Sequence, residues 1–207
     1  MSKGQKFYVV WKGRQPGIYP TWAQCEAQVK GFPEAQFKAF ATQVEAERAL
    51  AGQYDDYKGQ PAINQQRLLK VGPPVMPSYA VDAACRGYPG PVEYRCVKTD
   101  TREEVFRQGP YNNGSNNIGE FLAIAHALAL FTQNNITWPL YSDSELAIEW
   151  VKARRCRTHL APDASNAELF DLIARAEKWL KENRYAIPVL KWDTEAWGEN
   201  PADFGRK

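Results

Sequence analysis

The chain has 207 residues, enough for one large domain or two small ones, and its seven Trp, ten Tyr and nine Phe favour a packed core. Its longest apolar stretch, residues 121–131, is interrupted by His126 and is too short to span a bilayer, and the N-terminus has no apolar run typical of a signal peptide. The net charge of +2 is uneven, because residues 1–40 carry six Lys and Arg against two Glu, whereas residues 79–207 carry sixteen against eighteen acids.

Residues 1–52 predict a small α/β module. Its expected elements are strands over 6–11, from Ile18 and over 37–40, a helix over 22–29 capped by Thr21, and a helix from Thr42 to about Ala51. A unit of this size lies near the lower limit for an independent core. Because it carries the basic excess, it suits a module that binds a polyanion.

Residues 53–77 predict a flexible linker. The segment has four prolines and few periodic apolar positions, a composition typical of connections between domains. The expected division is therefore a module over 1–52, a linker over 53–77 and a second domain over 78–207.

Residues 78–207 predict a mixed α/β sheet flanked by helices. Three strands, at 79–85, 92–99 and 103–109, are joined by short turns and form an antiparallel meander. The later elements are helices and strands in alternation, ending in a helical turn: helix 119–133, strand 138–142, helices 145–153 and 165–183, and strand 187–192. This alternation favours parallel addition of the last two strands, giving five in all.

The four cysteines favour a reducing compartment. They lack CxxC spacing and lie inside predicted elements, so they are interpreted as small core residues and the protein as cytoplasmic. The four positions are Cys25, Cys85, Cys96 and Cys156.

Four acids stand where a protein seldom places a charge. Asp82 lies in a buried strand, Glu120 opens a long apolar helix, Asp143 ends a short strand, and Asp203 sits in a terminal turn flanked by Gly and Pro. An acid in a central strand is costly unless something compensates it, and a divalent metal is the usual compensation. Acids from several distant segments therefore suggest a metal-dependent phosphoryl-transfer centre.

Each acid has a plainer alternative. Asp82 would pair with an Arg, Glu120 would favour the helix dipole as a first-turn acid, and Asp143 would cap the following helix. Asp203 would be one more acidic residue in a terminal turn.

Two parts of the chain resemble a known family. The segments YAVDAACRG, NNIGEFLAIAHAL, LYSDSELAIEWV and WGENPADFGRK resemble type 1 ribonuclease H over nearly all of residues 78–207. The segment FYVVWKGRQPGIYPTWAQCEAQVKGFPEAQFKAFAT resembles the small hybrid-binding, viroplasmin-like domain found ahead of that nuclease. The resemblance implies a ribonuclease H-like mixed five-stranded sheet flanked by helices, preceded by a small α/β hybrid-binding module.

The resemblance also implies roles for the acids. Two Mg²⁺ ions about 4 Å apart are expected, with Mn²⁺ as an alternative. Asp82 would bridge both ions, Asp203 would complete the ion that activates water, and Glu120 and Asp143 would hold the ion at the leaving group. Glu120 would also contact the 2′-hydroxyl of the RNA. Glu199 matches a family acid beside the site, with a plain structural role as its alternative.

Further positions match nucleic-acid contacts of the family. In the second domain these are the backbone groups of Cys85 and Gly87 at the ribose edge, and a phosphate pocket of Ser115, Asn117, Thr158 and His159. In the front module Trp22 and Phe37 match aromatics that pack on the DNA backbone, and Lys38 matches a phosphate contact. The plain alternatives are a polar loop at Ser115 and Asn117, and core positions for the two aromatics.

Some residues depart from the family pattern. His159 replaces a hydroxyl residue, Tyr88 an Asn and Glu145 a Gln, all at expected substrate contacts, and Ala39 replaces a second Lys, which predicts a shallower dependence of binding on salt. His126 is interpreted as a packing residue. The basic run is interpreted either as a phosphate contact or as a solvated helix end, and it comprises Lys152, Arg154, Arg155 and Arg157.

The function predicted from these residues is hydrolysis of the RNA strand of RNA–DNA hybrids by two-metal-ion catalysis, leaving 5′-phosphate and 3′-hydroxyl ends. The expected partner is hybrid, with double-stranded RNA as a further partner of the front module, and the expected protein is a monomer without membrane contact. The first alternative is a non-catalytic protein that binds hybrid or double-stranded RNA. The second is a DNA-strand-transfer enzyme on the same fold, which also uses carboxylate–metal chemistry. The fold alone does not separate it from the nuclease, whereas the wording of the motifs favours the nuclease.

Overall fold

The computed structural model describes residues 6–54, 57 and 65–205 in two compact units. The first unit comprises Met1–Pro73 together with Thr194–Glu199, and the second comprises Pro74–Asp193 together with Asn200–Lys207. In the described part of the chain, no helix combines the length and apolar character that a membrane crossing requires.

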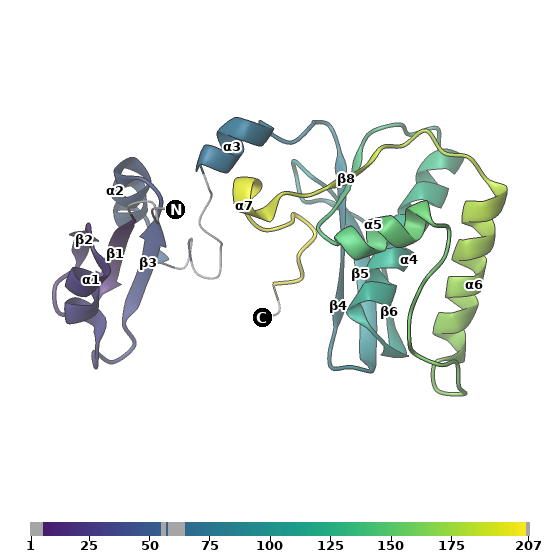
Figure 1. Cartoon of the computed structure of the whole chain (residues 1–207), viewed down its shortest axis with the longest axis horizontal. Helices are drawn as coiled ribbons and strands as arrows, with labels where there is room; N and C mark the ends of the chain where they lie inside the picture. Colours follow the sequence, from purple (N-terminus) through teal and green to yellow (C-terminus); the bar gives the residue numbers. More distant parts are fainter. Residues whose placement is uncertain (1–5, 55–56, 58–64, 206–207) are drawn as a thin grey trace. The chain divides into compact units, whose positions relative to one another are not determined.

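The first unit contains a three-stranded antiparallel sheet in the order β2-β1-β3. The strands are β1 (Phe7–Lys12), β2 (Gly17–Tyr19) and β3 (Gln36–Phe40), and the helices are α1 (Trp22–Val29) and α2 (Gln43–Ala51) (Figure 1). Thr21 and Thr42 cap the two helices as predicted, and Thr42 forms a capping box with Glu45. One side of the sheet buries Val9 with α2, and the other buries Val10 with α1, so the module has a core on each face.

Two further helices belong to the first unit. The helix α3 (Gln65–Val71) packs against α7 (Thr194–Trp197), and the indole of Trp197 donates to the carbonyl of Gly72 at 2.8 Å. The helix α3 lies in the segment predicted as a linker, where no helix was expected. The sequence did not predict it because α3 has few apolar positions and depends on a packing partner remote in sequence. Residues 55–56 and 58–64 of that segment lie outside the described residues.

The second unit contains a five-stranded sheet in the order β6-β5-β4-β7-β8. Its strands are β4 (Tyr79–Cys85), β5 (Gly90–Lys98), β6 (Glu104–Gly114), β7 (Leu140–Ser142) and β8 (Val189–Lys191). The first three pair antiparallel, and β7 and β8 are added in parallel. The predicted mixed five-stranded sheet is therefore confirmed.

The edge strand β6 is longer than predicted. The predicted strand ended at residue 109, whereas β6 continues to Gly114. An edge strand tolerates a proline, and the pairing of β5 with β6 has register shifts that accommodate the irregular residues.

Three helices complete the second unit: α4 (Asn116–Gln133), α5 (Glu145–Lys152) and α6 (Ala167–Glu182). The helix α4 packs on β4 and β5, with α5 and α6 against it. A Cβ added at Gly119 would lie 2.6 Å from Val92 Cγ2 and 2.7 Å from Ala83 Cβ. Gly119 therefore allows the first turns of α4 to approach the sheet closely, which brings Glu120 near β4.

Candidate active site

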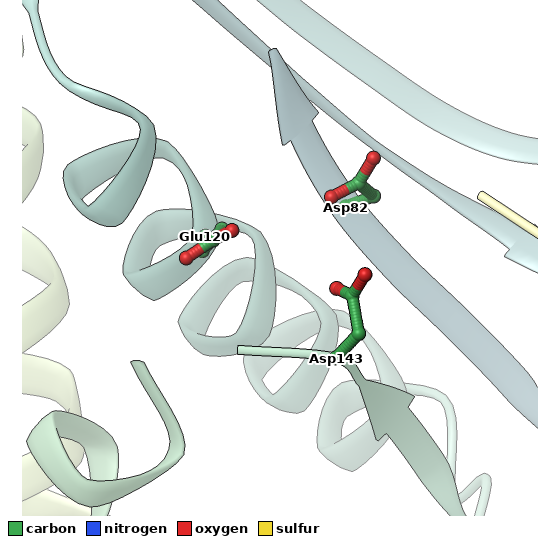
Figure 2. A group of neighbouring side chains, drawn as sticks. All are labelled: Asp82, Glu120 and Asp143. Carbon is green, nitrogen blue, oxygen red and sulfur yellow. The ribbon is translucent and has the colours of Figure 1, made fainter. Parts of the chain in front are cut away.

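Three carboxylates from three separate elements meet in the second unit. Asp82 lies on β4, Glu120 on α4 and Asp143 just after β7, and Figure 2 shows the three side chains converging. Each offers an oxygen, and these oxygens all lie within 4.8 Å of one another. Glu120 is buried and the two aspartates are half-buried. Such close approach of three acids is costly unless protons or a cation compensate the charge.

Asp82 has the most perturbed acidity of the three. Burial, followed by repulsion from Asp143, raises its pKa to about 8, and a backbone hydrogen bond from Ala83 opposes part of this shift. Its cross-strand neighbour is Arg95, but among the described residues no basic side chain forms an ion pair with Asp82. The alternative that Asp82 is a strand acid neutralised by an Arg is therefore wrong.

Glu120 is held between polar neighbours. Burial raises its pKa to about 7, while a hydrogen bond from Ser144 acts in the opposite direction, as does the charge of Lys191. The amide of Asn116 donates to Glu120 Oε1 at 2.7 Å. Because α4 begins at Asn116 after the N-cap Ser115, Glu120 lies in the second turn, and its alternative role as a first-turn acid is wrong.

Asp143 is supported by two residues from the C-terminal part of the chain. The amide of Asn200 donates to Asp143 Oδ1 at 3.2 Å, and Lys191 Nζ donates to the main-chain carbonyl of Asp143 at 2.7 Å. The N-cap of α5 is Ser144, whose hydroxyl accepts from the amide of Ala147. The alternative that Asp143 is a helix cap is therefore wrong.

Asp203 lies at the same cleft but outside the group of three. The cleft has a volume of about 390 Å³ and is lined by the four carboxylates together with Ala83, Ala84, Cys85, Arg86, Asn116 and Phe204. Asp203 repels Asp82 and so adds to the rise in its pKa. One oxygen of Asp203 accepts from the amide of Gly205 at 2.5 Å, so the terminal turn also uses this side chain.

The donor set fits a hard divalent cation. Carboxylate oxygens are the ligands that Mg²⁺ and Mn²⁺ prefer, and three such groups lie within reach of one ion. The rise of the pKa of Asp82 and Glu120 has burial as its main cause and repulsion between the acids as its second source, so a bound cation would relieve part of it. Glu199 belongs to the other compact unit, and its predicted role stays a prediction.

The predicted substrate contacts of the second unit lie in different settings. Cys85 lines the cleft, and its thiol donates to the carbonyl of Gly87, a residue with φ of 101°. Ser115 is the buried N-cap of α4 and Asn117 lies in its first turn, so the alternative of an ordinary polar loop is wrong. Thr158 and His159 lie in the segment between α5 and α6, where the Thr158 hydroxyl accepts from the amide of Leu160.

The predicted contacts of the front module are only partly exposed. Trp22 is 45% exposed and Phe37 37%, and their rings lie 5.7 Å apart, so the alternative that they are core aromatics is wrong. Lys38 Nζ donates to the carbonyl of Tyr57 at 2.6 Å, and burial lowers its pKa. The aromatic pair is therefore the more accessible part of this surface.

Sequence reasoning missed the residues that support the carboxylates. Asn116, Lys191 and Asn200 were not singled out, although each contacts Glu120 or Asp143. For Asn116 the spacing of four residues from Glu120 on a helix was a usable signal. Lys191 and Asn200 reach the site from positions remote in sequence, and no local pattern indicates such contacts.

The comparisons with known proteins agree with the predicted resemblance. Residues 6–50 match the family described as the ribonuclease H1 N-terminal domain. Ribonuclease H1 of Rattus norvegicus is 42% identical over 64 residues, which are 30% of this chain and 22% of the relative. Ribonuclease H1 of Homo sapiens is 55% identical over 40 residues, which are 19% of this chain and 14% of the relative. Ribonuclease H of Crithidia fasciculata is 59% identical over 44 residues, which are 21% of this chain and 9% of the relative. The chain thus matches about a fifth or less of the length of these relatives.

The similar solved structures are ribonuclease H domains. The N-terminal RNase H domain of a Mycobacterium tuberculosis protein is 19% identical with a TM-score of 0.38, over 56% of this chain and 87% of the other. The LC11 RNase H1 in complex with an RNA/DNA hybrid is 19% identical with a TM-score of 0.35, over 56% of this chain and 85% of the other. At this level these structures assign no role to any residue here. The chain resembles type 1 ribonucleases H with an N-terminal hybrid-binding domain, as predicted.

Proposed function

We propose that the chain is a metal-dependent ribonuclease that cuts the RNA strand of RNA–DNA hybrids. The observation that carries the proposal is the group of three carboxylates, whose oxygens lie within 4.8 Å of one another at an open cleft. The match of residues 6–50 to the ribonuclease H1 N-terminal domain supports hybrid as the substrate. Products with 5′-phosphate and 3′-hydroxyl ends follow if water attacks the phosphorus directly.

The acids provide the binding site for divalent cations, with Mg²⁺ as the proposed ion and Mn²⁺ as an alternative. Asp82, Glu120 and Asp143 would hold them, and Asp203 lies at the same cleft to complete the set. When bound, two such ions supply water activation, stabilisation of the phosphorus and neutralisation of the leaving 3′-oxygen. Asn116 and Asn200 hold the Glu120 and Asp143 side chains by hydrogen bonds, so these carboxylates are oriented before substrate arrives.

The front module would bind the hybrid through the exposed Trp22 and Phe37 rings, which offer flat apolar surfaces for a sugar–phosphate backbone. Joining this module to the nuclease raises the local concentration of substrate and favours repeated cuts on one duplex. Double-stranded RNA as a second partner of the module, a monomeric state and a cytoplasmic location are part of the same proposal.

Cleavage of a strand-labelled hybrid tests the proposal. The full chain is incubated with RNA–DNA, DNA–DNA and RNA–RNA duplexes, with Mg²⁺ and with EDTA, beside the Asp143→Asn variant. We expect loss of the hybrid's RNA strand alone, only with metal, and a fall of at least about 10³-fold for the variant. Tight binding of hybrid without cleavage in Mg²⁺ or Mn²⁺ would favour the non-catalytic binding protein instead.

A further inference from the structure

Asp203 lies in a part of the chain that regular secondary structure does not hold. Residues 203–205 belong to no helix or strand. Irregular segments are more mobile than helices and strands unless side chains hold them. An acid that serves as a metal ligand needs a fixed position, so the anchor of this segment matters for the site.

Arg95 on β5 is that anchor. Its Nε donates to the carbonyl of Ala202 at 2.8 Å, and its Nη2 donates to the carbonyl of Asp203 at 2.6 Å. The guanidinium thus binds two successive carbonyls of the terminal segment through one edge. A lysine ammonium cannot reproduce this geometry, because it lacks the planar array of donors.

Phe204 adds an apolar part to the same contact. The guanidinium carbon of Arg95 lies 4.7 Å from the centre of the Phe204 ring, and that of Arg107 lies 5.1 Å from it. Both distances are within the range of a cation–π contact. The residue after Asp203 is therefore packed on two side chains of the sheet.

The two arginines are themselves held in place. Arg107 binds Glu104 at 2.8 Å and Glu93 at 3.3 Å, and Arg95 lies 3.8 Å from Glu104. Arg95 pairs in register with Asp82 on β4 and with Arg107 on β6, so these three side chains share one face of the sheet. Arg95, the anchor of Asp203, therefore lies on the strand next to the one that carries Asp82.

We propose that Arg95 is a positioning residue that sets the distance of Asp203 from Asp82 and so determines metal affinity at the candidate site. The inference rests on the proposed function, because it takes the carboxylates as metal ligands. Arg95 acts on the main chain of Asp203, whose carboxylate lines the cleft and accepts from the amide of Gly205 through one oxygen. Loss of Arg95 is therefore expected to raise the metal concentration needed for cleavage more than it lowers the cleavage rate at saturating metal.

The test compares Arg95→Gln and Arg95→Lys with Lys98→Gln, using the full chain. Lys98 lies on the same strand and pairs with Glu103 at 2.7 Å, so its substitution removes a positive charge of β5 away from the terminal segment. The dissociation constant for Mn²⁺ is measured by titration calorimetry without nucleic acid, and the Mg²⁺ concentration for half-maximal hybrid cleavage is measured separately. We expect the dissociation constant and the half-maximal concentration to rise roughly 10-fold in Arg95→Gln and to stay near their wild-type values in Lys98→Gln.

Two further results separate positioning from general damage. High Mg²⁺ should restore most of the cleavage rate of Arg95→Gln, which a misfolded protein would not show. In an Asp203→Asn background, Arg95→Gln should have little further effect on Mn²⁺ binding, because both changes act on one ligand. If Arg95→Gln fails to fold, Arg95→Lys is measured in its place. It keeps the charge and the stem but lacks the planar array of donors, so the same loss of metal affinity is expected.

The possible failures are distinct. Absence of metal binding and cleavage in the wild-type chain would remove the proposed function and this inference with it. A wild type that binds Mn²⁺ and cleaves hybrid, beside Arg95 variants with unchanged metal affinity, would overturn the inference alone. An undiminished Arg95→Gln effect in the Asp203→Asn background would also overturn it.

Discussion

Asn200 hydrogen-bonds to Asp143 across 57 positions of sequence, with its side-chain amide 3.2 Å from Asp143 Oδ1. The same amide donates to the carbonyl of Val81 at 2.9 Å, and the Asn200 side-chain oxygen accepts from the amide of Ala202 at 2.9 Å. Asn200 is only 2% exposed. One neutral side chain therefore links β4, the Asp143 carboxylate and the turn that leads to Asp203.

Replacement of Asn200 by Asp should destabilise the metal-free protein by roughly 2–4 kcal/mol, because a buried donor becomes a second carboxylate that faces Asp143. Added Mg²⁺ should restore part of this loss. Urea unfolding in EDTA and in Mg²⁺ measures both effects.

Asn166→Asp is the matched control for this change. Asn166 is also buried, and its amide donates to the carbonyl of Ala161, away from the acids that line the cleft. We expect it to lose stability without any recovery in Mg²⁺. An equal response of both variants to the ion would contradict the assigned role of Asn200.

The acidity of Asp82 predicts an unusual dependence of stability on pH. Burial raises its pKa from 3.8 to about 8 in the folded protein, so between about pH 4 and pH 8 the folded state binds a proton that the unfolded state has lost. The free energy of unfolding in EDTA should therefore fall as the pH rises through this range. Glu120, whose pKa is raised to about 7, contributes a fall of the same sign. Asp82→Asn should therefore reduce the fall without removing it, and stabilise the metal-free protein at pH 8 by roughly 2–5 kcal/mol.

Chemical unfolding in EDTA at several pH values from 4 to 8 measures this effect. Glu149→Gln, at an exposed position of α5, serves as the control and should follow the wild-type curve. If Asp82→Asn were less stable than wild type at pH 8 without metal, the carboxylate would be stabilising the fold, against this prediction. Hybrid cleavage should be lost in Asp82→Asn in either case.

The sequence predicted the positions of the acids better than their supports. Asp82 and Asp143 were recognisable because each follows or interrupts a short apolar strand, and the parallel pairing of β4 with β7 brings them together. The partners of these acids depend on contacts between remote segments, as with Lys191 and Asn200. The helix α3 was missed for the same reason, since its packing partner α7 lies more than 120 positions later.

The two tryptophans of the front module should separate binding from folding. Trp22 is exposed beside Phe37, whereas the indole of Trp11 donates to the carbonyl of Ala49 at 3.0 Å and stacks on Tyr57. Trp22→Ala should weaken hybrid binding by roughly 1–2 kcal/mol and change stability little. Trp11→Ala should destabilise the module by roughly 3–5 kcal/mol.

Fluorescence anisotropy with a labelled hybrid measures binding by the Asp143→Asn chain, in which cleavage is blocked, and the tryptophan changes are made in that background. Thermal unfolding of the same proteins measures stability. A Trp22→Ala protein that binds as tightly as its parent at several salt concentrations would argue against the aromatic pair as the binding surface. Loss of stability in that variant would instead indicate a packing role.

His126 should affect acid stability and not catalysis. Its ring stacks on Phe106 with the centres 4.0 Å apart, and its Nδ1 lies 3.5 Å from the hydroxyl of Tyr94. Burial lowers the pKa of His126 below its usual 6.5, so at lower pH the unfolded state takes up a proton that the folded state resists. This group therefore reduces stability as the pH falls below about 6.5.

Replacement of His126 by Gln should remove this loss of stability at low pH. As the pH falls from 7 to 5, the unfolding free energy of the variant should therefore rise relative to that of wild type. The exposed His159, changed to Gln, provides the control for stability. Hybrid cleavage at saturating Mg²⁺ should change less than about twofold in His126→Gln, since His126 does not line the carboxylate cleft. A fall of 100-fold or more in the cleavage rate, with the fold intact, would instead indicate that His126 takes part in proton transfer.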